Sequence, residues 1–487
     1  MLPLQISVSI LNAVLLTFLA LKYAHMMQLG GYRYRALFNF LLDKRQVYTL
    51  RLFALSLLGF GAAFILRMFV NGLFLGLGLL LYFGLGLFLI LHLRRSKSKV
   101  PLKMTARVWR LLCVTFVLSY AATFGISLFL SRSGLTPTGM VFIPCLATVL
   151  PVIVLAASVI VWPYEWIVRR VYLARARRKL FSPQYKDLIR IGITGSYGKT
   201  TCKNILTQML EKKYSVAASP SSFNTPMGFC RTVNEVLKPE HQILIMEMGA
   251  RYKGDIKFMT KLFRPHHGIL TAIGSAHLET FKTLQNICSE KYQLINSLPP
   301  DGIRVVGGEK PDNIAMCTEM AKKLGVSDQQ IAEAVAELKP TPHRLEHIVT
   351  EHGVNILDDS YNANPDSVKM ALEQLQSIAC ESAKKSRADI HKIILTPGMV
   401  ELGKHGKCEN FKFGVHMARV ADKVIIVNEL NKQMLHDGLI AGGFSEENIF
   451  YARTLDDAKK LYSAGGKITL KSGDVLLIEN DLPDNFI

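Results

Sequence analysis

The clearest candidate for chemistry is a glycine-containing segment that follows a short β-branched run. Ile189–Thr194 form that run, and Gly195-Ser-Tyr-Gly-Lys-Thr-Thr201 follows it, before a helix-compatible segment. A strand, a glycine turn and a helix in this order are typical of a phosphate-binding loop, whose backbone N–H groups and helix N-terminus face phosphate oxygens. Lys199 would reach the terminal phosphates of a nucleotide, and the Thr200 hydroxyl would bind Mg²⁺. The two glycines are three positions apart rather than the usual five, so this is a shorter variant of the loop.

Three further residues could hold metal or act on a phosphoryl group. Glu247 follows an apolar run at 242–246, and a carboxylate at a strand tip suits Mg²⁺. His277 follows a second such run at 267–273, and Lys291 lies fourteen residues further on. Taken singly, each residue has an ordinary interpretation. Glu247 could be a surface glutamate, His277 a structural histidine and Lys291 a solvated helical lysine. These residues become candidates only as a set.

The order of motifs resembles the Mur ligases, which build the peptide of bacterial cell-wall precursors. The resemblance lies in the loop, in Met-Glu247-Met-Gly-Ala, in Ile-Gly-Ser-Ala-His277-Leu-Glu and in Glu-Lys291-Tyr, and it continues in Pro-His-Arg344-Leu-Glu and in the segment 358–366. That last segment, Asp-Asp-Ser-Tyr-Asn-Ala-Asn-Pro-Asp, is most similar to members that add D-Ala-D-Ala to UDP-N-acetylmuramoyl-tripeptide. The resemblance covers residues 189–487.

The resemblance implies a role for each motif residue. Lys199, His277, Lys291 and Arg344 would act in catalysis, with Lys291 as a carbamate. Two Mg²⁺ ions would be held by Thr200, Glu247, His277 and Lys291. ATP would be bound by Gly195, Ser196, Tyr197, Gly198, Lys199, Thr200, Thr201, Asn313, Arg344, Asp359, Tyr361, Asn362 and Asn364.

The elements that must position these residues are α/β in type. We expect a P-loop central domain over 189–340, shorter than is usual in the family, and a Rossmann-like C-terminal domain over 341–487. Within the latter, apolar runs predict strands at 353–357, 392–396, 423–427 and 475–478. The loop 396–403, Thr-Pro-Gly-Met-Val-Glu-Leu-Gly, resembles the family's loop near the incoming amine, and a plain turn is the alternative.

The first third of the chain is a different kind of sequence. Apolar stretches at about 4–24, 52–71, 73–93, 111–131 and 140–162 approach or exceed the ~20 residues that cross a bilayer as a helix. We therefore expect an all-α membrane domain of five transmembrane helices over 1–168 and a basic linker over 169–188. A uridine-diphosphate-binding domain, which normally opens Mur ligases, is not recognisable here.

The charge distribution predicts the orientation of the spans. Residues 1–190 contain 23 of the 58 basic residues and 3 of the 38 acidic ones, which leaves 35 of each in the remainder. The excess lies in the loops between spans one and two and between spans three and four, and after span five, as the positive-inside rule requires of cytoplasmic segments. The N-terminus is then outside a bacterial inner membrane, and the catalytic domains are in the cytoplasm. This distribution argues against nucleic-acid binding.

These observations predict an ATP-dependent amide ligase at the membrane. The partners would be the lipid bilayer, a muramyl-peptide or lipid-linked carboxylate, and an amino acid or dipeptide amine such as D-Ala-D-Ala. A capsule-type poly-amino acid is an alternative carboxylate. A nucleotide-gated transporter and a non-catalytic scaffold descended from a ligase are the alternatives outside ligase chemistry. Arg67, inside the second span, could mark a transport path or extend to the surface. The sequence leaves the oligomeric state open.

Overall fold

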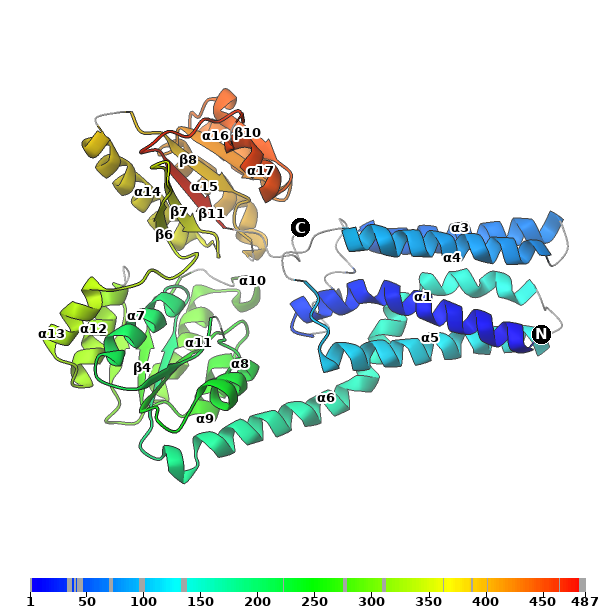
Figure 1. The fold of residues 1–487 in the computed structure, drawn as a ribbon, viewed down its shortest axis with the longest axis horizontal. Helices are drawn as coiled ribbons and strands as arrows, with labels where there is room; N and C mark the ends of the chain where they lie inside the picture. The colour runs from blue at the N-terminus through cyan, green and yellow to red at the C-terminus, as the bar shows by residue number, and fades with distance from the viewer. Residues whose placement is uncertain are drawn as a thin grey trace. The chain divides into compact units, whose positions relative to one another are not determined.

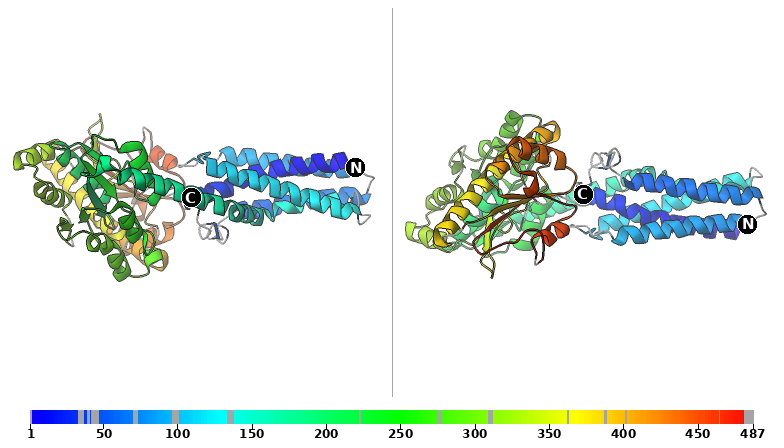
Figure 2. Two further views of the ribbon diagram at one scale, coloured as in Figure 1. Left: turned by 90° about the horizontal axis from the view of Figure 1, so that it is seen from below. Right: turned by 90° about the horizontal axis from the view of Figure 1, so that it is seen from above.

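The computed structural model describes residues 2–32, 37–38, 41, 47–69, 73–95, 101–132, 138–221, 223–274, 278–308, 312–361, 363–386, 389–400, 402–463 and 465–480. The chain divides into two compact units, residues 1–170 and residues 171–482. Figures 1 and 2 show the ribbon, with the helices of the first unit in blue to cyan and the second unit in green to red.

The first unit is all-α. Helices α1 and α5 lie side by side along their length, as do α3 and α4 (Figures 1 and 2). Four helices in the described part of the chain are long and apolar enough to cross a membrane, and the apolar stretch Leu77–His92 within α4 is shorter. The third predicted span, at 73–93, therefore stays a prediction. The helices are α1 (Leu2–Leu29), α3 (Val47–Phe69), α4 (Leu73–Arg95), α5 (Ala106–Arg132), the 3-10 helix η1 (Thr138–Ala147) and α6 (Leu150–Leu180).

The region expected as a single last span, 140–162, is divided. Its first part is the 3-10 helix η1, which contains Pro144, and the α-helix begins only at Leu150. Pro151 is well suited to the first turn of α6, because the N–H that proline lacks has no partner there. The predicted linker at 169–188 is helical as far as Leu180, since α6 continues through it.

Polar side chains join α1 to α5 inside the bundle. The Asn12 amide donates to Thr123 Oγ1 (3.0 Å) and accepts from the Tyr82 hydroxyl of α4 (3.1 Å). On α5, Thr115, Ser119, Thr123 and Ser127 recur every four residues and are all buried. Small polar residues at this spacing let two helices approach closely and hydrogen-bond across the contact. This polar seam therefore fixes the pairing of α1 with α5.

The middle part of the second unit is built on a five-stranded parallel sheet. Its strand order is β2-β3-β1-β4-β5, with β1 at the centre between β3 and β4. Central parallel strands are covered on both faces, and the runs of apolar residues in β1 and β3 are buried accordingly. The strands are β1 (Ile189–Thr194), β2 (Val216–Ala218), β3 (Ile243–Glu247), β4 (His267–Leu270) and β5 (Arg304–Val306).

The helices that accompany this sheet are mostly short. The helix α7 follows the phosphate loop directly, and α12 packs against it. They are α7 (Lys199–Glu211), α8 (Pro226–Arg231), the π-helix η3 (Thr232–Val236), α9 (Asp255–Phe263), α10 (Leu278–Phe281), α11 (Leu284–Asn296), α12 (Asn313–Lys323) and α13 (Asp328–Ala336), preceded by the 3-10 helix η2 (Pro183–Tyr185).

The C-terminal part has a six-stranded sheet of order β10-β9-β8-β11-β7-β6. Only the pairing of β6 with β7 is antiparallel. Its parallel strands follow the chain order 4-3-2-5-1, not the 3-2-1-4-5-6 of dinucleotide-binding folds. This part of the chain is therefore similar to a Rossmann fold in having a mostly parallel sheet covered by helices, but its strand order differs. The strands are β6 (Glu346–Val349), β7 (Asn355–Asp359), β8 (Lys392–Thr396), β9 (Lys423–Val427), β10 (Ile449–Ala452) and β11 (Val475–Glu479).

Two apolar cores cover the faces of this second sheet. The larger includes residues of α14, α15 and α16, and the smaller includes Ala458 of α17. Helices α15 and α16 approach so closely that a Cβ on Gly414 or Gly438 would overlap backbone atoms of the other helix. The helices are α14 (Pro365–Ser386), α15 (Gly406–Ala418), α16 (Lys432–Ala441) and α17 (Leu455–Tyr462), with short 3-10 turns at η4 (Gly403–His405) and η5 (Glu446–Asn448).

The packing of α15 gives a stability prediction. Phe413 is 1% exposed in the larger core, whereas Phe411 on the same helix is 37% exposed. We expect Phe413→Ala to lower the free energy of unfolding by about 3–5 kcal/mol, because it leaves a cavity. Phe411→Ala should cost much less. Thermal and denaturant unfolding of the two variants, followed by circular dichroism, measures the difference, and equal losses would contradict this description of the core.

Candidate active site

The phosphate loop turns at the carboxyl end of β1, where the backbone is held on both sides. Gly195 has φ +157°, and a Cβ there would overlap Thr271 Oγ1. Gly198 has φ +77° and is the N-cap of α7. The Ser196 N–H donates to the Ala272 carbonyl (2.7 Å). The glycines are therefore required by left-handed backbone and by close packing, as the sequence predicted for a loop that wraps phosphates.

Lys199 begins α7 and folds back over this loop. Its Nζ donates to the carbonyl oxygens of Gly195 (2.8 Å) and Ser196 (3.1 Å). Burial lowers the pKa of Lys199 to about 8, against the opposing effect of the Glu247 carboxylate. The ammonium is still charged near pH 7, so it can attract the oxygens of a phosphate group inside the loop.

Glu247 faces the loop from the tip of β3. The Thr200 hydroxyl donates to its Oε2 (2.9 Å), and the Asn224 amide donates to its Oε1 (3.1 Å). Lys203 Nζ lies 3.7 Å from Oε2, and both side chains of this ion pair are almost fully buried. Lys203 also donates to the carbonyl oxygens of Ser219 and Ser221.

This oxygen cluster fits a magnesium ion. The Thr200 hydroxyl and the Glu247 carboxylate converge to 2.9 Å beside the phosphate loop. Mg²⁺ takes one or two protein oxygens of this kind and completes its shell with water and phosphate oxygens. Lys203 would balance the charge of the carboxylate when no ion is bound. The predicted pair Thr200 and Glu247 is thus brought together by the structure.

Lys291 is buried on α11, with 2% of its surface exposed. Burial, and then the Lys199 ammonium, lower its pKa to about 7, against the opposing effect of the Glu290, Asp255 and Glu247 carboxylates. The neighbouring Glu290 accepts hydrogen bonds from the backbone N–H groups of Gly254 and Ile256 at the start of α9. Near neutral pH, therefore, a large fraction of the Lys291 amine is unprotonated and nucleophilic.

Two of the predicted ligands, His277 and Asn362, lie outside the described residues. Asn313 begins α12 against the loop, because a Cβ on Gly198 would lie 2.8 Å from its Oδ1. This Oδ1 is buried and has no hydrogen-bond partner among the described residues. It is therefore an acceptor that a bound nucleotide could satisfy.

Arg344 lies at the start of the C-terminal part, on a turn with left-handed residues on either side, His343 (φ +59°) and Leu345 (φ +50°). His343 Nδ1 contacts Asp358 Oδ2 at 2.8 Å. The Arg344 guanidinium lies over the Tyr361 ring at 3.9 Å, and its charge contributes to the lowered pKa of Lys199, after burial. This turn thus holds Arg344 within electrostatic reach of the loop.

The other predicted nucleotide residues of this part have different surroundings. Asp359 is buried at the tip of β7, accepts from the Leu345 N–H (3.1 Å), and burial raises its pKa to about 6. Tyr361 is 47% exposed. Asn364 Oδ1 accepts from the N–H groups of Asp366 and Ser367 at the start of α14. Asn364 therefore has a structural role as a helix cap, whether or not it also contacts nucleotide.

Sequence reasoning missed Lys203, Asn224 and Glu479. Glu479 is fully buried at the tip of β11, beside Asp359 in the parallel register, and neither of its carboxylate oxygens has a partner among the described residues. Burial, and then the charge of Asp359, raise its pKa well above the usual value. Glu479 could have been predicted from the sequence, because it follows an apolar run as Glu247 does. Lys203 and Asn224 had no comparable signal.

Two family models match the second unit. The Mur ligase middle domain matches residues 193–357, and the glutamate ligase domain of the Mur ligases matches residues 343–479. Residues 193–479 belong to the Mur ligase family.

Individual Mur ligases are similar in sequence to this chain. The UDP-N-acetylmuramoyl-tripeptide–D-alanyl-D-alanine ligase of Bacillus subtilis is 28% identical over 268 residues, which are 44% of this chain and 56% of that protein. The ligase of the same name from Mycobacterium bovis is 26% identical over 361 residues, 59% of this chain and 69% of that protein. The similarity thus spans a little over half of the first of these relatives.

Solved Mur ligase structures have the same fold. The MurF ligase of Thermotoga maritima in complex with ADP is 25% identical, with a TM-score of 0.52, over 64% of this chain and 80% of that one. A MurF of Acinetobacter baumannii is 21% identical, also with a TM-score of 0.52, over 64% and 77%. This likeness supports the α/β architecture of the second unit.

The loop gives a binding prediction. We expect Lys199→Ala to weaken the binding of ATP with Mg²⁺ by at least roughly tenfold, a loss of about 1.4 kcal/mol, because the one ammonium inside the loop is removed. Lys257→Ala, at an exposed lysine of α9, is the matched control and should bind normally. Isothermal titration of a non-hydrolysable ATP analogue into the full chain measures both. Unchanged affinity in Lys199→Ala would contradict the assignment of the loop.

The pair of buried carboxyls gives a pH prediction. Because the folded-state pKa values of Asp359 and Glu479 are raised, the folded chain holds these protons more tightly than the unfolded chain does. Stability is therefore lost as the pH rises from the ordinary carboxyl range through about 6 for Asp359. Glu479→Gln removes one of the two charges, so its melting temperature relative to the parent chain should rise between pH 4.5 and 7.5.

The exposed Glu351 supplies the control. The variant Glu351→Gln should show a melting temperature that keeps a constant offset from the parent chain over this pH range. Differential scanning fluorimetry in matched buffers measures the melting temperatures of all three proteins. A difference between Glu479→Gln and the parent chain that does not change with pH would refute the raised pKa of Glu479.

Proposed function

We propose that the chain is an ATP-dependent carboxylate–amine ligase that works through an acyl phosphate. The observation that carries this proposal is the convergence of Lys199, Thr200 and Glu247 at the carboxyl edge of the middle sheet. In this arrangement a cationic loop lies beside an oxygen cluster that fits Mg²⁺. Membership of residues 193–479 in the Mur ligase family supports it.

The reaction has two steps. A substrate carboxylate oxygen attacks the γ-phosphorus of ATP, the bond to the β-phosphate oxygen breaks, and ADP leaves. The amine then attacks the acyl carbon, passes through a tetrahedral intermediate, loses a proton and expels phosphate. Both steps place negative charge on oxygens, which Lys199 at the loop and Arg344 at the domain junction are suited to stabilise.

The magnesium ions and the carbamate are part of this proposal. Thr200 and Glu247 would hold one Mg²⁺, and Lys291 with His277 a second, and such ions neutralise charge on the phosphate oxygens. Lys291 can form a carbamate only as a neutral amine, which attacks carbon dioxide and loses a proton. Its pKa of about 7 makes that form abundant at neutral pH. Asn313 and Asp359 would contact the nucleotide.

For the substrates, we propose D-Ala-D-Ala as the amine and a muramyl peptide as the carboxylate, in peptidoglycan precursor synthesis. The names of the relatives from Bacillus subtilis and Mycobacterium bovis support this choice. We place the enzyme at the inner membrane of a bacterium, with its N-terminus outside and the ligase domains in the cytoplasm, on the charge distribution of the loops.

A second candidate is favoured by one observation. Four helices of the first unit could cross a membrane, and an enzyme held there meets lipid-linked substrates more often than soluble ones. A lipid-linked carboxylate, or a capsule-type poly-amino acid, would then replace the nucleotide-linked muramyl peptide. The ligase chemistry and the residues that perform it are unchanged in this alternative.

The test is substrate-dependent ADP release by the full chain in detergent. With ATP, Mg²⁺, UDP-N-acetylmuramoyl-tripeptide and D-Ala-D-Ala present, we expect release that requires both the carboxylate and the amine. Glu247→Gln should lower the rate at least roughly a hundredfold, because it weakens the binding of the Mg²⁺ that would stabilise the developing negative charge, and losing one such stabilising group costs about 2.7–4 kcal/mol. Lys257→Ala should be unaffected.

Lys291→Ala separates the carbamate from a merely structural lysine. Its lost activity should return in part when propionate is added, because the small acid supplies a carboxylate in the space that the side chain vacates. ADP release without any carboxylate or amine dependence would refute the ligase proposal. Release that requires a lipid-linked carboxylate instead would select the second candidate.

A further inference from the structure

A buried carboxylate of the C-terminal part has no partner. Glu479 ends β11 with 0% of its surface exposed, and neither of its oxygens has a hydrogen-bond partner among the described residues. A polar group in this state has lost its water without a replacement, and such groups are uncommon in folded proteins. The ligase reaction proposed above gives Glu479 no role, so its position needs another explanation.

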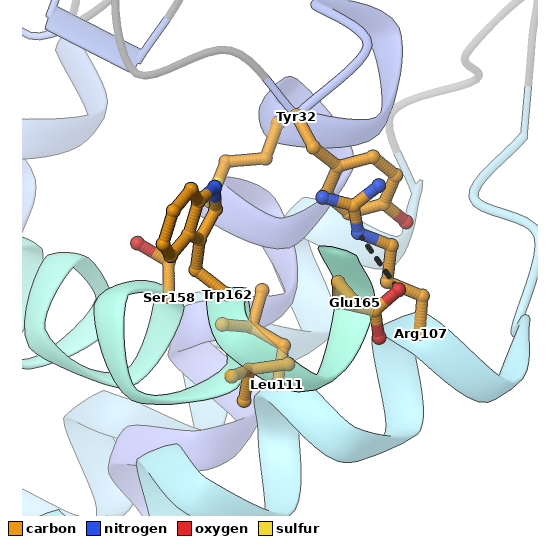
Figure 3. Close-up of a pocket in the computed structure, with 8 residues that line it drawn as sticks. Tyr32, Arg107, Leu111, Ser158, Trp162 and Glu165 are labelled. Carbon is orange, nitrogen blue, oxygen red and sulfur yellow. Dashed lines mark ion pairs between the residues drawn. The ribbon is translucent and has the colours of Figure 1, made fainter. Parts of the chain in front are cut away.

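Other enclosed carboxylates in the described part of the chain do have partners. Figure 3 shows Glu165 of the first unit beside Arg107, with 3.6 Å between Oε2 and the guanidinium Nε. Glu290 and Asp474 of the second unit each accept two hydrogen bonds from backbone N–H groups. Burial of a carboxylate is thus usually matched in this chain by a cation or by N–H donors, and Glu479 departs from that pattern.

Two more oxygen-bearing side chains lie beside Glu479 at the same edge of the sheet. Strand β11 lies between β7 and β8, and its register aligns Glu479 with Asp359 of β7. The register with β8 aligns Ile478 with Leu395. The next residue of β8, Thr396, therefore lies beside Glu479 on the other side, and the three form a row across adjacent strand tips.

All three side chains of this row point to one face of the sheet. Side chains alternate along a strand, and the residue two positions before each member of the row lies in the larger core. These residues are Leu357, Leu477 and Ile394. The row therefore continues that core at the carboxyl ends of the strands. It is closed to solvent, because Asp359 is 5% exposed and Thr396, like Glu479, is 0% exposed.

The charge of the two carboxylates is not balanced within the row. Arg344 acts on Asp359 through space and lowers its pKa, but burial and the neighbouring Asp358 charge oppose this, and the pKa is raised overall. Burial, and then the charge of Asp359, raise the pKa of Glu479. Without a ligand, a proton balances the pair. A cation between the two carboxylates would take the place of that proton.

We propose that Asp359 and Glu479 bind a hard divalent cation, Mg²⁺ or Ca²⁺, with Thr396 Oγ1 as a neighbouring oxygen. Such ions take carboxylate, carbonyl and water oxygens, and two carboxylates match their charge. Thr396 Oγ1 accepts one hydrogen bond, from the Gly398 N–H (2.9 Å), and keeps a second lone pair. The complete enclosure of Glu479 favours a bare ion over the ammonium group of a substrate, which would need an opening.

This ion would be separate from those at the phosphate loop, and the proposal does not rest on the ligase chemistry. It would join the tips of neighbouring strands, including Asp359, which accepts from the Leu345 N–H (3.1 Å) beside Arg344. The ion would therefore fix the turn that carries Arg344.

The test counts ions bound to the full chain in detergent at pH 7.5, without nucleotide. Mn²⁺ is the probe, because electron paramagnetic resonance distinguishes its free and bound forms, and Ca²⁺ and Mg²⁺ are added as competitors. All measurements are made in the Glu247→Gln background, which weakens the ion site at the phosphate loop. We expect saturable binding that a further Glu479→Gln change weakens at least roughly tenfold, because glutamine keeps the size of the side chain and removes its charge.

Glu351→Gln in the same background is the matched control, since Glu351 is exposed, and it should bind Mn²⁺ like the background chain. In addition, Ca²⁺ at constant ionic strength should raise the melting temperature of the parent chain more than that of Glu479→Gln. Unaltered circular dichroism of Glu479→Gln shows that lost binding is not lost folding. Mn²⁺ binding that Glu479→Gln leaves unchanged, or an equal effect of Ca²⁺ on both melting temperatures, would overturn the proposal and leave a proton on the pair.

These outcomes are separable from the ligase test. Ion binding is measured without ATP or amine, so a chain that binds Mn²⁺ through Glu479 but releases no ADP would refute the ligase proposal alone. Substrate-dependent ADP release without Glu479-dependent ion binding would refute the cation site alone. The pH prediction given above for Glu479→Gln applies to buffers that contain a chelator, in which the pair holds no ion.

Discussion

The parallel pairing of β1 with β3 is the constraint on which the active site depends. Its register aligns Ile193 with Glu247, so the phosphate loop that follows β1 and the carboxylate that ends β3 emerge at one edge of the sheet. The hydrogen bond from Thr200 to Glu247 crosses that edge. Moving either strand by two residues would separate the loop from the Glu247 carboxylate, although every motif residue would remain.

Burial then shifts the pKa values of the lysines that lie near this edge of the sheet. Lys199, Lys203 and Lys291 lie in largely enclosed surroundings, and burial lowers the pKa of each. The Glu247 carboxylate opposes that effect on all three, and Glu290 and Asp255 oppose it on Lys291. Lysine side chains beside the loop attract a polyanion such as ATP.

Much of this arrangement could be predicted from the sequence, because buried parallel strands are recognisable as apolar runs. Residues that acquire their role only through the fold could not be predicted. The apolar runs before Gly195, at 242–246 and at 392–396 are strands of parallel sheets that must be buried on both faces. The loop follows the first of them, and Glu247 ends the second. Lys203 and Asn224 could not be found this way, because a helical lysine and a loop asparagine acquire their role only from the fold. Glu479 could have been found, since it ends an apolar run as Glu247 does. The split of the last predicted span into η1 and α6 depends on proline positions that hydropathy does not weigh.

The polar seam between α1 and α5 has a consequence for synthesis. Asn12 and its partner Thr123 are separated by 111 residues. At a translation rate of about 5–20 residues per second, roughly 5–20 s pass between the synthesis of Asn12 in α1 and that of Thr123 in α5. During that interval the Asn12 amide must bond with water, with α4 through Tyr82, or with the machinery that inserts helices. The order in which the ribosome delivers the helices thus becomes part of how this bundle assembles.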